Sequence, residues 1–193
     1  MTKPALFPDF CTFSTLTMLK AHKMKKWIVL LFILSMILKL NAQAGIAITV
    51  IVAPPPGASI IVDSHLWDIS LVNDGSTSYQ NDNQGTMTIR SGSTWFYHVD
   101  FSSQNLGQLK QGTNYIPYYV KATAISSNTG LFGTPAIVAG YVQLTSTQSM
   151  WFIKKTPRDG IQFYIGIKIN PAAGEFYESG LYSDTLTITF STL

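Results

Sequence analysis

Histidine, cysteine and clustered carboxylates are the side chains that most often carry chemistry, and this sequence has few of them. From Gly45 onward the only histidines are His65 and His98, and the single cysteine of the sequence, Cys11, lies upstream. Asp63 and His65 are two residues apart, but a pair is not a ligand set. Because no His, Cys, Asp or Glu cluster has metal-ligand spacing, we expect no metal and no cofactor.

Acidic residues offer one arrangement for catalysis, a pair of carboxylates for glycoside hydrolysis. Glu175 and Glu178 would have to pair with Asp159 or Asp184. These residues lie in or beside predicted loops, where carboxylates are usually solvated. The sequence also contains no nucleophile elbow, H-E-x-x-H motif or P-loop. We therefore expect a protein that is not an enzyme.

Binding chemistry has two candidates. Lys154, Lys155 and Arg158 form a basic turn, which is either simply solvated or contacts an anionic lipid or an acidic partner. Aromatic side chains that faced solvent together would stack on sugar rings, although most such residues are core or cross-strand pairs. The residues considered for this platform are Phe96, Tyr119, Trp151 and Tyr164.

The elements that would position these side chains are strands. Short runs of alternating apolar and polar residues are separated by Gly, Pro, Asn, Asp and Ser clusters, and no long helical period follows residue 45. We expect an all-β fold, an immunoglobulin-like β-sandwich of roughly eight to ten strands. Residues 136–144 are predicted to form a strand, 149–170 a hairpin with its tip at 156–160, and 73–85 a turn-rich connection.

A leader precedes this region. Residues 24–44 combine Lys25 and Lys26, an apolar run of about 12 residues and the small-x-small end Ala42-Gln43-Ala44, which is typical of a secretory signal peptide. Met24 would be the natural start, so 1–23 is interpreted as an over-extended start. We therefore expect a secreted protein, or one in the periplasm in transit to the cell surface.

The net charge of +3 belongs to the leader. Six of the 13 basic residues precede residue 45, whereas the remainder has seven basic and nine acidic residues, a net charge of −2. The high isoelectric point is therefore no sign of nucleic-acid binding, and no nucleic-acid partner is expected.

The last predicted strand carries a family resemblance. Residues 180–189, GLYSDTLTIT, resemble the terminal G-x-Y-x-D-T-hydrophobic-T-hydrophobic-T segment of spore coat protein U-type domains, the subunits of archaic chaperone–usher pili. Residues 116–120, IPYYV, resemble the tyrosine-bearing middle strand of that family. The chain departs from the family in having no cysteine after Cys11. The motif strand comprises Gly180, Tyr182, Asp184, Leu186, Ile188 and Phe190.

The resemblance implies an immunoglobulin-like sandwich that lacks its last strand and is completed by the N-terminal strand of the next subunit, a form of β-augmentation. The implied partners are other pilus subunits, a periplasmic assembly chaperone and an outer-membrane usher. Independently, Tyr182 suits a corner position where its hydroxyl bonds to the backbone, Gly180 a turn with positive φ, and Asp184 an acceptor of backbone N–H groups.

The first predicted strand, 45–53, is the candidate donor strand, and Pro54-Pro55-Pro56-Gly57 ends it. Its alternating apolar residues are Ile46, Ile48, Val50 and Val52. The alternative is that this segment pairs within its own domain. We thus divide the chain into the leader, an N-terminal extension at 45–57 and a sandwich domain at 58–193.

Two other functions stay open at this point. A self-complete secreted β-sandwich that binds a host or surface glycan would have a similar sequence. A small outer-membrane β-barrel would also carry an export signal, but its strands need about 9–11 residues with a lipid-facing apolar band. Several predicted strands here are shorter, and their opposite faces are polar.

Overall fold

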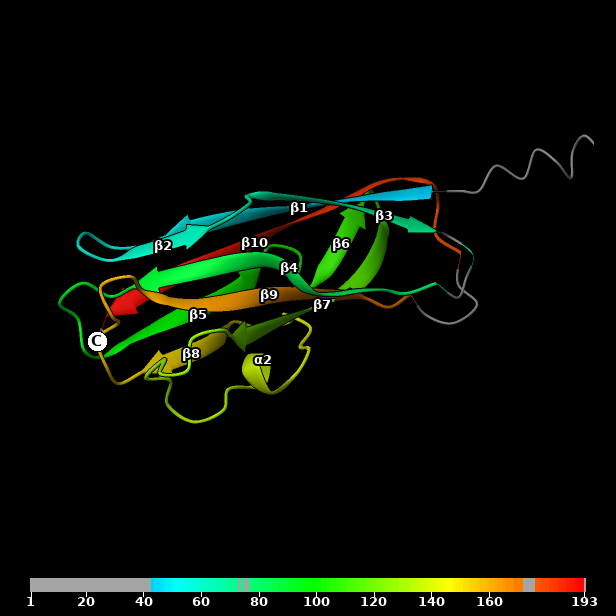
Figure 1. Cartoon of the computed structure of the whole chain (residues 1–193). Coiled ribbons are helices and arrows are strands. Elements are labelled where there is room, and N and C mark those ends of the chain that lie inside the picture. The colour runs from blue at the N-terminus through cyan, green and yellow to red at the C-terminus, as the bar shows by residue number, and fades with distance from the viewer. Residues whose placement is uncertain (1–42, 73, 75–76, 172–175, 193) are drawn as a thin grey trace, which may run out of the picture. The chain divides into compact units, whose positions relative to one another are not determined.

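The fold is all-β, as predicted. A computed structural model describes residues 43–72, 74, 77–171 and 176–192, which belong to one compact unit (Figure 1). Its only helix among these residues is the four-residue α2 (Ala136–Ala139). In this described part of the chain, no helix has the length and apolar character needed to cross a membrane.

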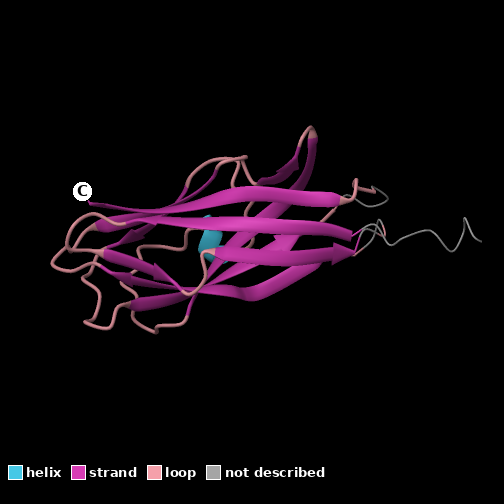
Figure 2. Ribbon diagram, turned by 90° about the horizontal axis from the view of Figure 1, so that it is seen from above, coloured by secondary structure: helices cyan, strands magenta, loops and turns pink. Residues whose placement is uncertain are grey.

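The strands form one curled sheet whose two halves face each other. In the first half, β10 lies between β1 on one side and β5 and β6 on the other; β3 extends the sheet beyond β1, and β8 extends it beyond β5. Figure 2 shows the long strands running side by side. The bounds in this half are β1 (Gln43–Ala53), β3 (Leu66–Val72), β5 (Tyr97–Ser103), β6 (Gln108–Gln111), β8 (Gln148–Phe152) and β10 (Gly180–Thr192).

The second half has the order β2-β4-β9-β7 and is joined to the first through the β6–β7 hairpin. Every neighbouring pair in it is antiparallel. A register shift between Asn81 and Gly85 interrupts the β4–β9 ladder. The strand bounds are β2 (Ser59–Val62), β4 (Tyr79–Arg90), β7 (Asn114–Ala124) and β9 (Ile161–Ile169).

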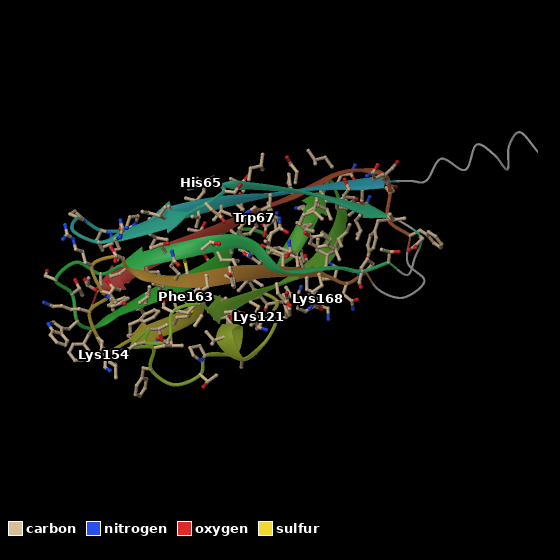
Figure 3. The ribbon with its side chains drawn as sticks, viewed as in Figure 1. His65, Trp67, Lys121, Lys154, Phe163 and Lys168 are labelled. Carbon is tan, nitrogen blue, oxygen red and sulfur yellow. The ribbon has the colours of Figure 1, made fainter. Side chains whose placement is uncertain are left out.

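The core lies between the two halves because each strand turns its apolar side inward. On β9, for example, Ile161, Phe163, Ile165, Ile167 and Ile169 are all buried, as their alternation predicts. The Trp67 indole of β3 reaches across to β4 (Figure 3). A Cβ atom at Gly85 would lie 2.7 Å from Cζ2 of that indole, so the close approach requires glycine there.

Three local predictions were wrong. Residues 136–139 form α2 rather than a strand, and beyond it only Val142 makes a bridge, to Val120. Residues 149–170 are not a hairpin, because β8 pairs with β5 whereas β9 pairs with β4 and β7. The polar residues 79–85 belong to β4, since Tyr79–Asn81 and Gly85 pair with β9 despite the lack of apolar alternation.

The position of the last strand also differs from the prediction. β10 is not left with an unpaired edge, because β1 of the same chain lies beside it; the cis alternative is what the single chain adopts. The extension predicted at 45–57 is therefore part of the sheet as far as Ala53. Of the predicted leader, 24–42 lies outside the described residues, and Gln43 and Ala44 begin β1.

Candidate functional site

The candidate site is the slot between β10 and β3 that β1 fills. β1 runs parallel to β10, from Ala44 beside Gly180 to Ala53 beside Thr189, and antiparallel to β3 (Figure 1). Both strands thus begin at one end of the sheet and finish at the other. We call the end marked by Gln43 and Gly180 the amino pole, and the end marked by Ala53 and Thr192 the carboxyl pole.

The alternating apolar side chains of β1 turn to the core of their own domain, which is the alternative to donation to a neighbour. Ile46, Ile48 and Val50 are at most 2% exposed, and Val52 is half-buried. Burial of three such side chains stabilises a domain by an amount on the order of 4–9 kcal/mol, which is comparable with a whole domain's net stability of about 5–15 kcal/mol. Ile51 points to the opposite face and is 48% exposed.

His65 is a polar neighbour of β1. Nδ1 of His65 lies 2.9 Å from the carbonyl oxygen of Val50, whose N–H donates to the carbonyl of His65. Otherwise β1 is held among the described residues by its two backbone ladders and by apolar packing. If this strand leaves, it gives up its backbone ladders and apolar contacts but few side-chain hydrogen bonds.

The other flank of β10 is held by the buried carboxylate of Asp184. Its Oδ2 accepts hydrogen bonds from Ser103 Oγ at 2.5 Å and from Tyr118 Oη at 2.6 Å, and its Oδ1 accepts one from the Asn105 N–H at 3.0 Å. Gly107 N–H in turn donates to Ser103 Oγ at 2.6 Å. One carboxylate therefore ties β10 to β5, to the β5–β6 turn and to β7.

This carboxylate accepts a backbone N–H, as predicted for Asp184, but its side-chain partners were missed. The alternation of β10 could have indicated them, because Asp184 lies on the same inward face as Tyr182 and Leu186. A buried carboxylate must be paired or hydrogen-bonded. Burial, followed by the nearby charge of Asp184, raises the pKa of Tyr118 well above its usual value, so its hydroxyl stays a donor at neutral pH.

The rest of the motif strand also has structural roles. Tyr182 Oη donates to the carbonyl of Glu178 at 3.1 Å, the backbone bond expected of a corner tyrosine. Gly180 has a φ of 151°, and a Cβ atom there would collide with the Gln111 side chain. Leu186, Ile188 and Phe190 are buried in the core.

Apolar side chains gather at the carboxyl pole. A hollow of about 340 Å³ is lined by Phe96, Phe132, Trp151, Phe152 and Ile153. Four of these side chains are exposed by 40% or more, and only Phe152 is buried. Phe132 was not predicted to belong to a surface. A large apolar side chain in a loop between Gly130 and Gly133 could have indicated it.

The amino pole carries a second hollow of about 410 Å³, which is lined in part by Asn114, Tyr115, Phe176 and Glu178. Phe176 is 72% exposed and Tyr115 52%. The Glu178 carboxylate accepts a hydrogen bond from Asn114 Nδ2 at 2.8 Å and remains exposed. This hollow is thus lined by aromatic rings and polar groups together, with one carboxylate among them.

The predicted sugar platform is divided. Phe96 and Trp151 lie in one hollow, as the glycan hypothesis requires. Tyr119 and Tyr164 are half-buried on β7 and β9, outside that hollow. The four aromatics therefore do not form one continuous row.

The candidate chemical groups do not converge either. His98 Nε2 lies 3.1 Å from Asp100 Oδ2, and its ring packs on Trp151. Among the residues described by the structure, no three His, Cys, Asp or Glu side chains are grouped as a metal would require. Asp159 follows β8 at the carboxyl pole whereas Glu178 lies at the amino pole; Glu175 is outside the described residues.

No family model matches the chain, and no curated protein sequence matches it. The resemblance to spore coat protein U-type domains therefore stays a prediction.

Proposed function

We propose that this protein is a non-enzymatic, secreted structural subunit that assembles by exchanging β1 between copies. It would form a surface pilus or coat with an immunoglobulin-like sandwich as its repeating unit. Its partners would be further copies or sister subunits, a periplasmic chaperone and an outer-membrane usher. The observation that carries the proposal is the position of β1, an apolar strand inserted between β10 and β3 and joined to the domain only through the Pro54–Gly57 turn.

The geometry of β1 supports this proposal because its buried side chains supply a large share of the stability, and its ladder contacts are backbone hydrogen bonds that the same strand from another copy can also make. Its inward residues alternate with period two, so their pattern is the same when the strand is inserted in either direction. A slot that accepts β1 from its own chain is therefore suited to β1 from a neighbour. Without any occupant, the slot would expose apolar side chains and unpaired strand edges.

The direction of insertion decides what assembles. β1 stays attached to its own domain at the carboxyl pole, through residues 54–57. In the parallel direction of the single chain, Ala53 would again lie beside Thr189 of the acceptor, so that two carboxyl poles would meet in a closed pair. In the antiparallel direction, the carboxyl pole of one copy meets the amino pole of the next. Such a heterologous contact propagates into an open chain, so a fibre requires the antiparallel direction.

The experiment compares the chain from Gly45 onward with a version that begins at Pro54. We expect SDS-resistant ladders that collapse on boiling for the first chain and none for the second. Ile48→Asp should abolish the ladder, since it places a charge in the core. Ile51→Asp is the matched control, because Ile51 lies on the exposed face of the same strand.

The outcome that would contradict the proposal is a stable full-length monomer that forms no ladder with or without an added copy of β1 as a peptide. A ladder that survived removal of 45–53 would also contradict it, because assembly would then not depend on β1.

A second candidate is a self-complete domain that binds a glycan. It is favoured by the exposure of Phe96 and Trp151 in one hollow, since aromatic rings stack on sugars. It ranks second because the side chains that line this hollow are almost entirely apolar, with the Trp151 indole as the one that carries a hydrogen-bond donor to fix a sugar. Glycan-array binding that is lost in Trp151→Ala would support it.

A further inference from the structure

The two poles of the domain carry unlike surfaces. At the carboxyl pole, Lys154 and Lys155 follow directly after Ile153 of the aromatic hollow, and Nζ of Lys155 lies 5.2 Å from the centre of the Trp95 ring. Figure 3 shows Lys154 at this end of the sheet, away from Lys121 and Lys168. We call Trp95, Phe96, Phe132, Trp151, Ile153, Lys154 and Lys155 the basic aromatic pole.

At the amino pole, the apolar surface of Tyr115 and Phe176 is bordered by the Glu178 carboxylate. Lys110 lies opposite Tyr115 in the β6–β7 ladder but does not line the hollow. We call Tyr115, Phe176 and Glu178 the acidic aromatic pole. The two poles are separated by most of the 13 residues of β10, a length of about 40 Å.

We propose that the basic aromatic pole of one copy packs against the acidic aromatic pole of the next. The inference rests on the proposed strand exchange and adds a second contact to it. In the antiparallel direction β1 leaves its domain at the carboxyl pole and enters the acceptor at the amino pole, so these two surfaces are brought together by the strand itself.

The occupant follows from chemistry as well as from position. Large exposed apolar side chains are typical of contact surfaces. Two exposed cations beside one such surface and an exposed carboxylate beside the other are complementary in charge. A second copy of this chain supplies both properties at the required place. The exchanged strand and the turn at 54–57 form one connection between successive subunits. The pole contact would add a second connection and so fix the angle between them.

The test uses charge exchange in the full chain from Gly45 onward. Lys154→Glu with Lys155→Glu makes both poles acidic, and Glu178→Lys makes both poles basic. We expect each variant alone to form SDS-resistant ladders about tenfold more slowly than the wild type at low ionic strength. An equimolar mixture should assemble severalfold faster than either variant alone, because each contact between the two different variants joins unlike charges. The matched control is Lys121→Glu with Lys168→Glu, which changes the net charge equally on β7 and β9.

Each outcome is decisive. Ladders that form at the wild-type rate in both pole variants, or a mixture that is as slow as its components, would overturn the pole contact and leave strand exchange intact. A wild type without any β1-dependent ladder would overturn both proposals. Unchanged assembly, together with loss of binding to phosphatidylglycerol vesicles in the lysine variant, would assign the basic aromatic pole to an anionic lipid surface instead.

Discussion

The two flanks of β10 are held by different kinds of interaction. On one flank, a backbone ladder with β5 is supplemented by three hydrogen bonds that the Asp184 carboxylate receives from β5, the β5–β6 turn and β7. On the other flank, β1 contributes buried apolar side chains and a backbone ladder, with His65 as its polar neighbour. The first flank depends on the geometry of particular atoms, whereas the second depends on alternation and shape.

This difference indicates which part of the fold can be exchanged between copies. Hydrogen bonds to a buried carboxylate are lost outright when either partner moves, because the groups left behind are desolvated and unpaired. Apolar alternation is satisfied equally well by the same strand from another molecule. The Asp184 side of β10 is therefore the permanent part of the domain, and the β1 side is the part suited to assembly.

The largest expected effect is on the permanent flank. Asp184→Ala leaves the Ser103 and Tyr118 hydroxyls and the Asn105 N–H without their acceptor. We expect a loss of about 3–5 kcal/mol in the free energy of unfolding, measured by urea titration of the chain from Gly45 onward. Ser183→Ala, on the exposed face of the same strand, should change it by less than about 0.5 kcal/mol. Equal effects of both variants would contradict the anchoring role of Asp184.

The second-largest expected effect is on the flank of β10 that β1 occupies. Ile48→Ala removes a buried side chain from β1 and should lower the free energy of unfolding of the monomer by about 2–4 kcal/mol. Ile51→Ala should be nearly neutral, since Ile51 is 48% exposed. The comparison is sharpened by adding the β1 peptide in excess, which should stabilise Ile48→Ala but not Asp184→Ala by a comparable amount. If the peptide stabilised Asp184→Ala more than Ile48→Ala, the two flanks would have been assigned wrongly.

A smaller effect concerns pH. Burial raises the pKa of Tyr118 and of Tyr97 well above the usual value of about 10. The folded state thus keeps both hydroxyls neutral while the unfolded chain ionises. Their contribution to stability is complete below about pH 10 and is lost as the pH rises above it. Melting temperatures measured between pH 8 and 11 should fall at the alkaline end, and less steeply in Tyr118→Phe; a flat profile would contradict this.

Much of the fold could be predicted from alternation, because one face of the long strands β1, β7, β9 and β10 is buried, whereas the first half of β4 lacks this pattern. The first and last strands, with Ile46, Ile48 and Leu186 inward, follow directly from their period of two. Pairing could not be predicted, since it depends on partners distant in sequence. For example, β8 pairs with β5 and not with β9, its neighbour along the chain.

The candidate site shows the same division. The residues that β1 presents to the core were predicted, but its pairing within the single chain depends on the slot between β10 and β3, which no local pattern encodes. The partners of Asp184 lie 66 to 81 residues away, so parity marked the carboxylate but not Ser103 or Tyr118. Phe132 joins this surface because its loop is bonded to β8 and the residue after it, through Phe132 N–H to the Trp151 carbonyl and Ile153 N–H to the Gly130 carbonyl.

The most direct test of the account asks in which direction β1 is inserted. Because Cys11 is the only cysteine of the sequence, pairs introduced into the chain from Gly45 onward form the only disulfides available. Ile51→Cys with Thr187→Cys reports the parallel register of the single chain, in which these residues are partners. Ile51→Cys with Leu181→Cys or Ser183→Cys reports the antiparallel direction, since these registers keep the same β1 side chains inward.

Within one domain, Ile51 is separated from Leu181 and Ser183 by six and four residue steps along β10, about 13–20 Å, too far for a disulfide. The measurement is non-reducing electrophoresis of oxidised, assembled protein. We expect covalent multimers from Ile51→Cys combined with Leu181→Cys or Ser183→Cys. A disulfide that forms only between Ile51→Cys and Thr187→Cys, and only within monomers, would contradict this expectation.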